Sequence, residues 1–176
     1  QIHLGNYLGA IRQHIEMQKS FETFLFIADL HALTTIRDAT KMRELTLELV
    51  KAYLALGLDP VKTVFFQQSA IPEHAELCWV FDTITPMALI ERAHAFKDAT
   101  AKGKKDATVG LFNYPVLQAA DILLYQPDLV PVGQDQKQHI EMTRDIAIKF
   151  NNTYGDTFKI PEPFIKKEVA VVPGTD

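Results

Sequence analysis

Apolar residues in this chain follow two patterns, which alternate along the sequence. Short continuous apolar runs at 24–30 and 63–68, both rich in phenylalanine, are typical of buried β-strands. Between them, apolar residues recur at helical spacing over 38–56, which predicts a long amphipathic helix. Gly57 and Pro60 follow directly, and a glycine cap with a proline after it is a common helix end. This part of the chain is therefore predicted to run strand, helix, strand.

The same alternation continues along the rest of the chain. A further strand is predicted at 129–133, and the lysine-rich stretch 101–110 is predicted to be a loop. Further helices are predicted over residues 7–19, 72–83, 86–98, 114–125 and 135–150. We expect the fourth of these helices to have Asn113 as its cap and Pro115 near its first turn. Strands that alternate with helices are typical of a parallel sheet with helices on both faces, so we predict an α/β, Rossmann-like fold.

One predicted helix carries an acidic residue in an otherwise apolar setting. In its sequence, YPVLQAADILLY, Asp121 is surrounded by alanine, isoleucine and leucine, and a buried carboxylate is costly unless a donor satisfies it. Tyr114, Gln118 and Asp121 stand at i, i+4 and i+7, so one helical face presents a phenol, an amide and a carboxylate. Apolar walls with a few orienting polar groups are what a small-molecule pocket needs. The structural alternative is that Asp121 pairs with a buried arginine, Arg144 or Arg92.

Two junctions between predicted elements carry polar and glycine residues. At the first helix, Gly5 permits close approach of the backbone to a ligand, and the helix N-terminus offers N–H groups to phosphate. His3 can donate a hydrogen bond to a phosphate oxygen. The structural alternative is that Gly5 is a turn residue and Asn6 a helix cap, and these four residues taken alone favour that alternative.

The second junction follows the strand predicted at 129–133. Gly133 again permits close approach, and Asp135 can either cap the next helix or accept hydrogen bonds from two ribose hydroxyls. Gln136 is expected to direct its amide toward the same place. A glycine turn followed by an aspartate cap explains the segment equally simply, and in isolation that reading is slightly favoured.

Composition and charge narrow the class of protein. The chain has 176 residues, of which 47% are hydrophobic and 23% charged, as expected for one globular domain with a sizeable core. A net charge of −4 gives no general attraction to nucleic acid or to an anionic membrane. The six histidines and the single cysteine, Cys78, form no ligand cluster in the sequence, and no apolar run is long enough to span a bilayer. We expect a soluble, cytoplasmic protein without a metal site of its own.

Three phrases carry a resemblance to a known family. HLGNYLGAIRQ at 3–13, YPVLQAADILLY at 114–125 and VPVGQDQKQHIEMTRDIA at 130–147 closely resemble bacterial tryptophanyl-tRNA synthetases, which are class I aminoacyl-tRNA synthetases. The resemblance covers essentially the whole chain, in order. It implies that residues 1–176 form a single, partial catalytic nucleotide-binding domain. The first strand, the KMSKS loop after Asp176 and the anticodon-binding domain are expected to lie outside it, so the chain is expected to be weakly active alone.

The resemblance implies ATP-dependent activation of L-tryptophan to tryptophanyl-adenylate and its transfer to tRNA(Trp) by a homodimer, with Mg²⁺ bound through the phosphates. The ATP-binding residues that it implies are His3, Gly5, Asn6, Gly133, Gln134, Asp135 and Ala170, the first three of which are also implied to be catalytic. The residues that it implies for tryptophan are His31, Tyr114, Gln118, Asp121, Val132 and Gln136. In this family the matching acid accepts the indole N–H, which would satisfy Asp121.

Three alternatives remain open. Tyrosyl-tRNA synthetases commonly carry a Tyr–x3–Gln–x2–Asp pattern on this helix, which Tyr114, Gln118 and Asp121 match, whereas tryptophan enzymes more often have methionine at the position of Gln118. A tyrosine hydroxyl can donate to Asp121 as an indole can, but the segment 130–139 favours tryptophan. A nucleotidyltransferase of the same superfamily would share the His–x–Gly pattern and the use of ATP, without need for an indole-sized pocket. A non-catalytic ATP-binding module would bind nucleotide and form no adenylate.

Overall fold

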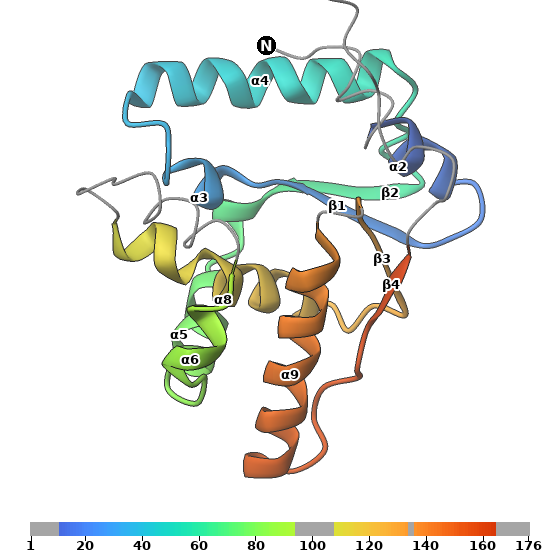
Figure 1. Ribbon diagram of the computed structural model, residues 1–176. Helices are drawn as coiled ribbons and strands as arrows, with labels where there is room; N and C mark the ends of the chain where they lie inside the picture. The colour runs from blue at the N-terminus through green and yellow to red at the C-terminus, as the bar shows by residue number, and fades with distance from the viewer. Residues whose placement is uncertain (1–10, 94–107, 134–135, 165–176) are drawn as a thin grey trace, which may run out of the picture. The chain divides into compact units, whose positions relative to one another are not determined.

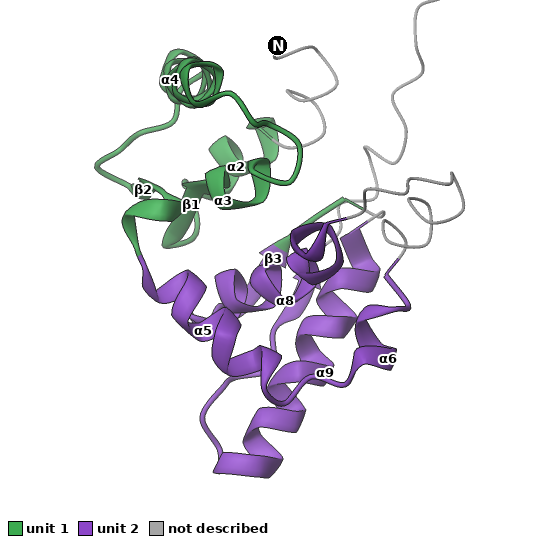
Figure 2. Cartoon of the chain, turned by 90° about the vertical axis from the view of Figure 1, so that its left-hand side faces the viewer, with its two compact units in different colours: residues 1–71, 131–134, 165–176 green, residues 72–130, 135–164 purple. Residues whose placement is uncertain are grey.

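The computed structural model describes residues 11–93, 108–133 and 136–164 of the chain (Figure 1). The chain divides into two compact units (Figure 2). The first unit contains residues 1–71, 131–134 and 165–176, and the second contains residues 72–130 and 135–164. Six predicted ATP-binding residues lie outside the described residues, namely His3, Gly5, Asn6, Gln134, Asp135 and Ala170. That the whole chain makes up one partial catalytic domain stays a prediction.

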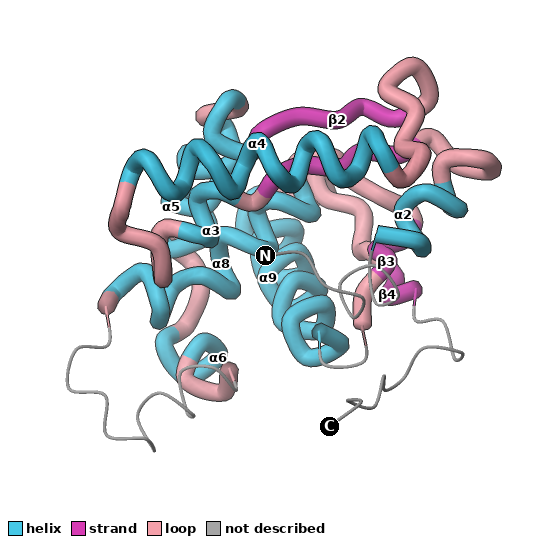
Figure 3. Tube along the Cα trace, turned by 90° about the horizontal axis from the view of Figure 1, so that it is seen from above, coloured by secondary structure: helices cyan, strands magenta, loops and turns pink. Residues whose placement is uncertain are grey.

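The first unit is built on two parallel strands joined by a helix. β1 (Thr23–Ile27) pairs in parallel with β2 (Thr63–Gln67), and Thr23 lies opposite Thr63 in the register. α4 (Ala39–Ala55) connects the strands and packs against β1, as Figure 3 shows. The buried residues of this unit's core are Ile11, Tyr53 and Leu58, against which Ile15, Leu25, Leu49 and Phe65 pack. The predicted order of strand, helix and strand is confirmed.

Local interactions set the two ends of α4. At its start, the Asp38 carboxylate accepts hydrogen bonds from the backbone N–H groups of Thr40, at 2.8 Å, and Lys41, at 2.9 Å. These bonds satisfy two of the N–H groups that a helix N-terminus leaves without an intrahelical partner. At its end, Gly57 has a φ of +106°, which a residue with a Cβ adopts only with strain. Both ends agree with the helix predicted over 38–56.

Three short helices also lie in the first unit. They are α2 (Arg12–Met17), α3 (Asp29–Ala32) and the 3₁₀ helix η2 (Gln68–Ala70). The strand predicted over 24–30 is too long, because β1 ends at Ile27 and Asp29 already begins α3. The acid that interrupts the apolar run therefore marks a change of element. α3 and η2 lie at the carboxyl ends of β1 and β2, which places polar groups from both segments beside each other.

The second unit is mostly helical. Its helices are α5 (Glu73–Asp82), α6 (Met87–Ile90), α8 (Val109–Leu123) and α9 (Lys137–Tyr154). α8 packs against both α5 and α9. The strands β3 (Leu129–Pro131) and β4 (Glu162–Phe164) form a second two-stranded sheet. β4 is missing from the sequence prediction, because three residues with a proline among them carry no strand pattern.

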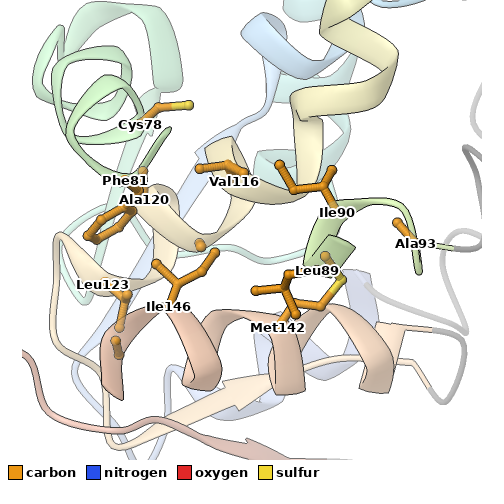
Figure 4. Packing of buried hydrophobic residues seen from close by; sticks show 12 residues of the cluster. Cys78, Phe81, Leu89, Ile90, Ala93, Val116, Ala120, Leu123, Met142 and Ile146 are labelled. Carbon is orange, nitrogen blue, oxygen red and sulfur yellow. The ribbon is translucent and has the colours of Figure 1, made fainter. Parts of the chain in front are cut away.

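The core of the second unit surrounds the middle of α8. Val116 and Ala120 of α8 belong to one cluster of buried side chains together with Ile146 of α9 and Phe81 of α5 (Figure 4). All four are fully buried or nearly so. Alanines on α8 allow the neighbouring helices to approach closely, and the larger side chains of α5 and α9 fill the space. α8 is therefore held between two helices, with its polar residues fixed in position.

Two predictions about the helices of this unit are wrong. α8 begins at Val109 rather than near Asn113, and Thr108 is its cap, since the Thr108 hydroxyl accepts from the N–H of Leu111 at 3.3 Å. Pro115 therefore lies inside the helix, where it removes one backbone hydrogen bond. The helix predicted over 86–98 is described only as the short α6, which ends at Ile90, and residues 94–98 lie outside the described part.

Candidate functional site

Asp121 lies on α8 and makes a hydrogen bond to α5. Only 3% of its surface is exposed, and its Oδ1 lies 2.6 Å from Nδ1 of His74. His74 is the second residue of α5, and its side chain is completely buried. A hydrogen bond to an ionised group is stronger than one between neutral groups, so it offsets much of the cost of burying the carboxylate. The acid in the apolar helix is thus satisfied within the second unit.

The predicted arginine alternative for Asp121 is wrong. Arg144 binds the carboxylate of Glu162, with 2.7 Å between Nη1 and Oε1. Arg92 is exposed and lies 3.8 Å from the carboxylate of Asp145. Both guanidinium groups are occupied elsewhere, and the group that meets Asp121 is the imidazole of His74.

The second nitrogen of His74 also has a partner. Nε2 lies 2.8 Å from the hydroxyl of Tyr125, which follows the end of α8. Burial, together with the negative charges of Asp121 and Glu73, raises the pKa of the Tyr125 phenol above its usual range. A carboxylate oxygen can only accept, so Nδ1 carries a hydrogen and donates to Asp121. In the neutral ring Nε2 is then the acceptor, and the Tyr125 phenol donates to it.

Tyr114, the first polar residue of the predicted stripe, meets a different histidine. Its hydroxyl lies 2.7 Å from Nε2 of His139 on α9, and the two rings meet edge to face with centroids 5.3 Å apart. Burial raises the pKa of Tyr114, so its phenol is also protonated and can donate to the imidazole. α8 therefore presents two polar groups, Tyr114 and Asp121, each oriented by an imidazole from a neighbouring helix.

Gln118 lies between these two residues on α8. It is half-buried, and none of the residues in the described ranges makes a hydrogen bond to its amide. The spacing of Tyr114, Gln118 and Asp121 is realised on one continuous helix, as predicted. The structure thus brings an oriented phenol, an oriented carboxylate and an amide onto α8, which is a group of both donors and acceptors on an apolar support.

A second polar group lies in the first unit, at the carboxyl ends of β1 and β2. The carboxylate of Asp29 accepts from Nε2 of Gln67, at 2.6 Å, and from the N–H of Ser69, at 2.9 Å. Burial raises the pKa of Asp29, but the hydrogen bonds from Gln67 and Ser69 outweigh that effect and hold the pKa below its usual value. Gln68 is fully buried and accepts from the N–H of Leu30 at 3.1 Å. This edge of a parallel pair is where α/β folds bind ligands.

The other predicted residues that the structure describes lie near strand and helix ends. His31 is half-buried on α3 in the first unit. Val132 is half-buried and Gly133 exposed, directly after β3. Gln136 is half-buried and occupies the cap position of α9. Their roles toward ATP and tryptophan stay predictions.

Sequence reasoning missed three residues of these polar groups. His74 and Tyr125 complete the chain of hydrogen bonds at Asp121, and Asp29 organises the edge of β1 and β2. The buried acid indicated that a donor was needed, but not which one, because His74 is 47 positions away in the sequence. For Asp29 there was a local signal, since an acid directly after an apolar strand run is typical of a strand-to-helix junction.

Comparison with known proteins decides the family. The family model described as "tRNA synthetases class I (W and Y)" matches residues 1–176, which is the whole chain. The chain belongs to this family of class I tRNA synthetases. The resemblance identified in the sequence is confirmed, and so is the Rossmann-like α/β fold class, because the solved structures that the chain matches belong to the same family.

Individual relatives point to the tryptophan branch of the family. The chain is 55% identical, over 99% of its length, to a tryptophan--tRNA ligase of Fusobacterium nucleatum, and covers 54% of that protein. It is 51% identical to the same ligase of Campylobacter jejuni. A crystal structure of tryptophanyl-tRNA synthetase from Campylobacter jejuni, complexed with ADP and tryptophan, matches 99% of the chain with a TM-score of 0.92, and the match covers 55% of that structure. The chain spans about half the length of the curated relatives it matches.

The described part of the chain contains no group of three His, Cys, Asp or Glu side chains that could hold a metal ion. Burial, with the charges of Asp82 and Asp121, raises the pKa of the Cys78 thiol to about 12, so this cysteine stays protonated. None of the described helices has the length and apolar character needed to cross a membrane.

Proposed function

We propose that the full-length protein that carries this chain activates L-tryptophan with ATP and transfers it to tRNA(Trp). In the first step, the carboxylate of tryptophan attacks the α-phosphorus of ATP. A carboxylate–phosphorus bond forms, the bond to the bridging oxygen breaks, and pyrophosphate leaves. In the second step, a ribose hydroxyl at the end of the tRNA attacks the activated carbonyl and releases AMP. The substrates supply both nucleophiles, so the protein has to position them and stabilise phosphate charge.

The observation that carries this proposal is the buried carboxylate of Asp121. Because His74 lies 2.6 Å from Oδ1, the carboxylate of Asp121 is held as an acceptor at a fixed point of α8. An ionised carboxylate has about four lone-pair positions, so it can accept an indole N–H in addition to the imidazole N–H. Phenylalanine has no side-chain donor, and its binding would leave acceptor capacity unused in an apolar setting. The relatives named as tryptophan--tRNA ligases support the same assignment.

Tyrosine is the competing substrate within the family. Its hydroxyl is also a donor, and Tyr114, Gln118 and Asp121 have the spacing expected of a tyrosine site. The identities of 55% and 51% to tryptophan--tRNA ligases favour tryptophan. The nucleotidyltransferase and the non-catalytic ATP-binding module are less well supported, because the whole chain matches the synthetase family.

For ATP, we propose the residues that the resemblance assigns. His3, Gly5, Asn6, Gly133, Gln134, Asp135 and the backbone near Ala170 would contact the nucleotide. Mg²⁺ commonly binds through substrate phosphates together with waters, so we propose that it is held by oxygens of the triphosphate. A homodimer and tRNA(Trp) as partner complete the proposal.

ATP–pyrophosphate exchange by the full-length protein, measured with each of the twenty amino acids in turn, tests this function. We expect exchange with tryptophan and little with tyrosine or phenylalanine. Exchange with tyrosine alone would transfer the assignment to the tyrosine branch. Nucleotide binding without amino-acid-dependent exchange would favour a non-catalytic module.

The variant Asp121→Asn tests the residue that carries the proposal. Its amide oxygen can still accept from His74, but its NH2 group then faces the indole donor. Loss of a hydrogen bond to a charged group costs about 1.5–3 kcal/mol, so we expect kcat/KM for tryptophan to fall roughly 10- to 100-fold while the KM for ATP changes little. Asp145→Asn is the matched control, because Asp145 is an exposed aspartate on α9. Equal losses for tryptophan and ATP in Asp121→Asn would indicate a structural role.

A further inference from the structure

The hydrogen bonds around Asp121 form a chain of three side chains from separate places in the second unit. His74 comes from α5, Asp121 from α8 and Tyr125 from the segment after α8. The distances are 2.6 Å from Nδ1 to Oδ1 and 2.8 Å from Nε2 to the phenol oxygen. His74 is completely buried and Asp121 almost so, and the rings of His74 and Tyr125 lie 5.5 Å apart. Such a chain is costly to bury unless every member is satisfied.

We propose that His74 is a positioning residue for Asp121, and that the His74–Asp121 hydrogen bond, supported by Tyr125, makes the carboxylate select a substrate that donates an N–H. This inference rests on the proposed function, since it concerns how the same carboxylate recognises its amino acid. It assigns a role in substrate discrimination to two residues that make their contacts through Asp121. Neither residue is proposed to touch the reacting atoms.

The direction of the chain follows from its chemistry. A carboxylate oxygen can only accept, so the short contact with Asp121 places a hydrogen on Nδ1 of His74, and in a neutral ring Nε2 then accepts from the Tyr125 phenol. The opposite tautomer would place the Nδ1 lone pair 2.6 Å from a carboxylate oxygen, and the two would repel each other. The contact therefore requires an N–H on Nδ1, and Tyr125 stabilises that arrangement. Asp121 receives a hydrogen and has none to give.

This arrangement has a consequence for specificity. If the Asp121 side chain were free to rotate, it would accommodate a ligand without a donor at little cost. Fixed by the buried N–H of His74, the carboxylate can only accept, and a ligand without a donor removes its contact with water without replacing it by a hydrogen bond. Sites built to receive a hydrogen bond reject analogues that lack the donor far more strongly than they reject changes of size. His74 would therefore set how well tryptophan is distinguished from an isostere.

The experiment compares tryptophan with benzothienylalanine, in which sulfur replaces the indole N–H. ATP–pyrophosphate exchange by the full-length enzyme gives kcat/KM for each, and their ratio measures discrimination. In His74→Leu we expect this ratio to fall by about tenfold or more, through a higher KM for tryptophan, with the KM for ATP unchanged. His74→Asn is the rescue variant, because its amide can still donate to Asp121, and we expect it to keep the ratio within about threefold of the wild type.

Tyr125→Phe provides a second variant that retains the buried imidazole. It removes the hydroxyl that is bonded to Nε2 of His74 but leaves the imidazole in place. We therefore expect a smaller loss of discrimination than in His74→Leu, again with the KM for ATP unchanged. The role assigned to His74 is overturned if His74→Leu exchanges with tryptophan at the wild-type ratio to benzothienylalanine. It is equally overturned if both His74→Leu and His74→Asn weaken the binding of tryptophan and of ATP to the same extent. That result would indicate that His74 has a purely structural role. Failure of the proposed function is distinct, because the wild-type protein would then show no exchange with tryptophan at all.

Discussion

A second buried imidazole–phenol pair, in the first unit, illustrates how single residues respond to burial. Nδ1 of His14 lies 3.0 Å from the hydroxyl of Tyr53, and the two rings are stacked. Burial lowers the pKa of His14 from 6.5 to about 4, and burial also raises the pKa of Tyr53 to about 12. At neutral pH the hydrogen bond therefore joins a protonated phenol and a neutral imidazole.

This pair predicts a loss of stability in mild acid. The pKa of His14 is lower in the folded protein than in the unfolded chain, so the unfolded chain takes up the proton first as the pH falls. The contribution of His14 is fully present above pH 6.5 and is lost progressively as the pH falls to about 4. The loss amounts to at most about 3.5 kcal/mol, because each unit of pKa difference corresponds to about 1.4 kcal/mol.

Denaturant unfolding of the full-length protein at several pH values between 7 and about 4 measures this effect. Other groups also titrate over this range, so the comparison that isolates His14 is with His14→Phe, which keeps a ring but cannot be protonated. The variant is expected to lose less stability in acid than the wild type. The same pH dependence in both proteins would contradict the assigned pKa.

At Asp121, the sequence predicted the need for a hydrogen-bond donor but not its identity. Local periodicity places residues on one helix and shows which of them share a face. It contains no information about which residue of another helix lies opposite. His74 therefore had no signal in the sequence as a partner of Asp121, and the arginines that were considered instead are bound to Glu162 and Asp145.

Among the secondary-structure elements, α4 follows its sequence pattern most closely, and its end offers a test. Gly57 has a φ of +106°, and a Cβ built there would lie 3.9 Å from Cγ2 of Ile15, which is an ordinary contact. The cost of Gly57→Ala is therefore backbone strain alone, and we expect a loss of about 1–2 kcal/mol in the free energy of unfolding. Denaturant unfolding of the full-length protein measures it.

Gly110→Ala is the matched control for this substitution. Gly110 lies in the first turn of α8 and is exposed, and its φ is not positive. Alanine is favoured over glycine in a helix, so this variant is expected to be as stable as the wild type or more stable. If both variants lost stability to the same extent, left-handed strain at Gly57 would not explain the effect.

α8 shows why the start of a helix is harder to predict than its existence. Pro115 in the sequence suggested a first turn, whereas the helix begins six residues earlier, at Val109. A proline near the start of a helix is favourable, but packing against α5 and α9 outweighs the loss of one backbone hydrogen bond inside α8. The tertiary contacts that decide this balance are not local features of the sequence.

For the whole molecule, the alternation of strands and helices was sufficient to predict the fold class. In the described residues, β1 and β2 pair in parallel and α4 connects them, as this fold class requires. Solved structures of the same family match the chain. The chain covers 54% of its relative from Fusobacterium nucleatum. The tests of function proposed above therefore use the full-length protein.

A crystal structure of the full-length protein bound to tryptophan would test the role of Asp121 directly. We expect the indole nitrogen to lie about 2.7–3.2 Å from a carboxylate oxygen of Asp121, while Nδ1 of His74 stays bonded to Oδ1. An indole nitrogen bonded to another residue, with Asp121 in contact only with protein groups, would contradict it.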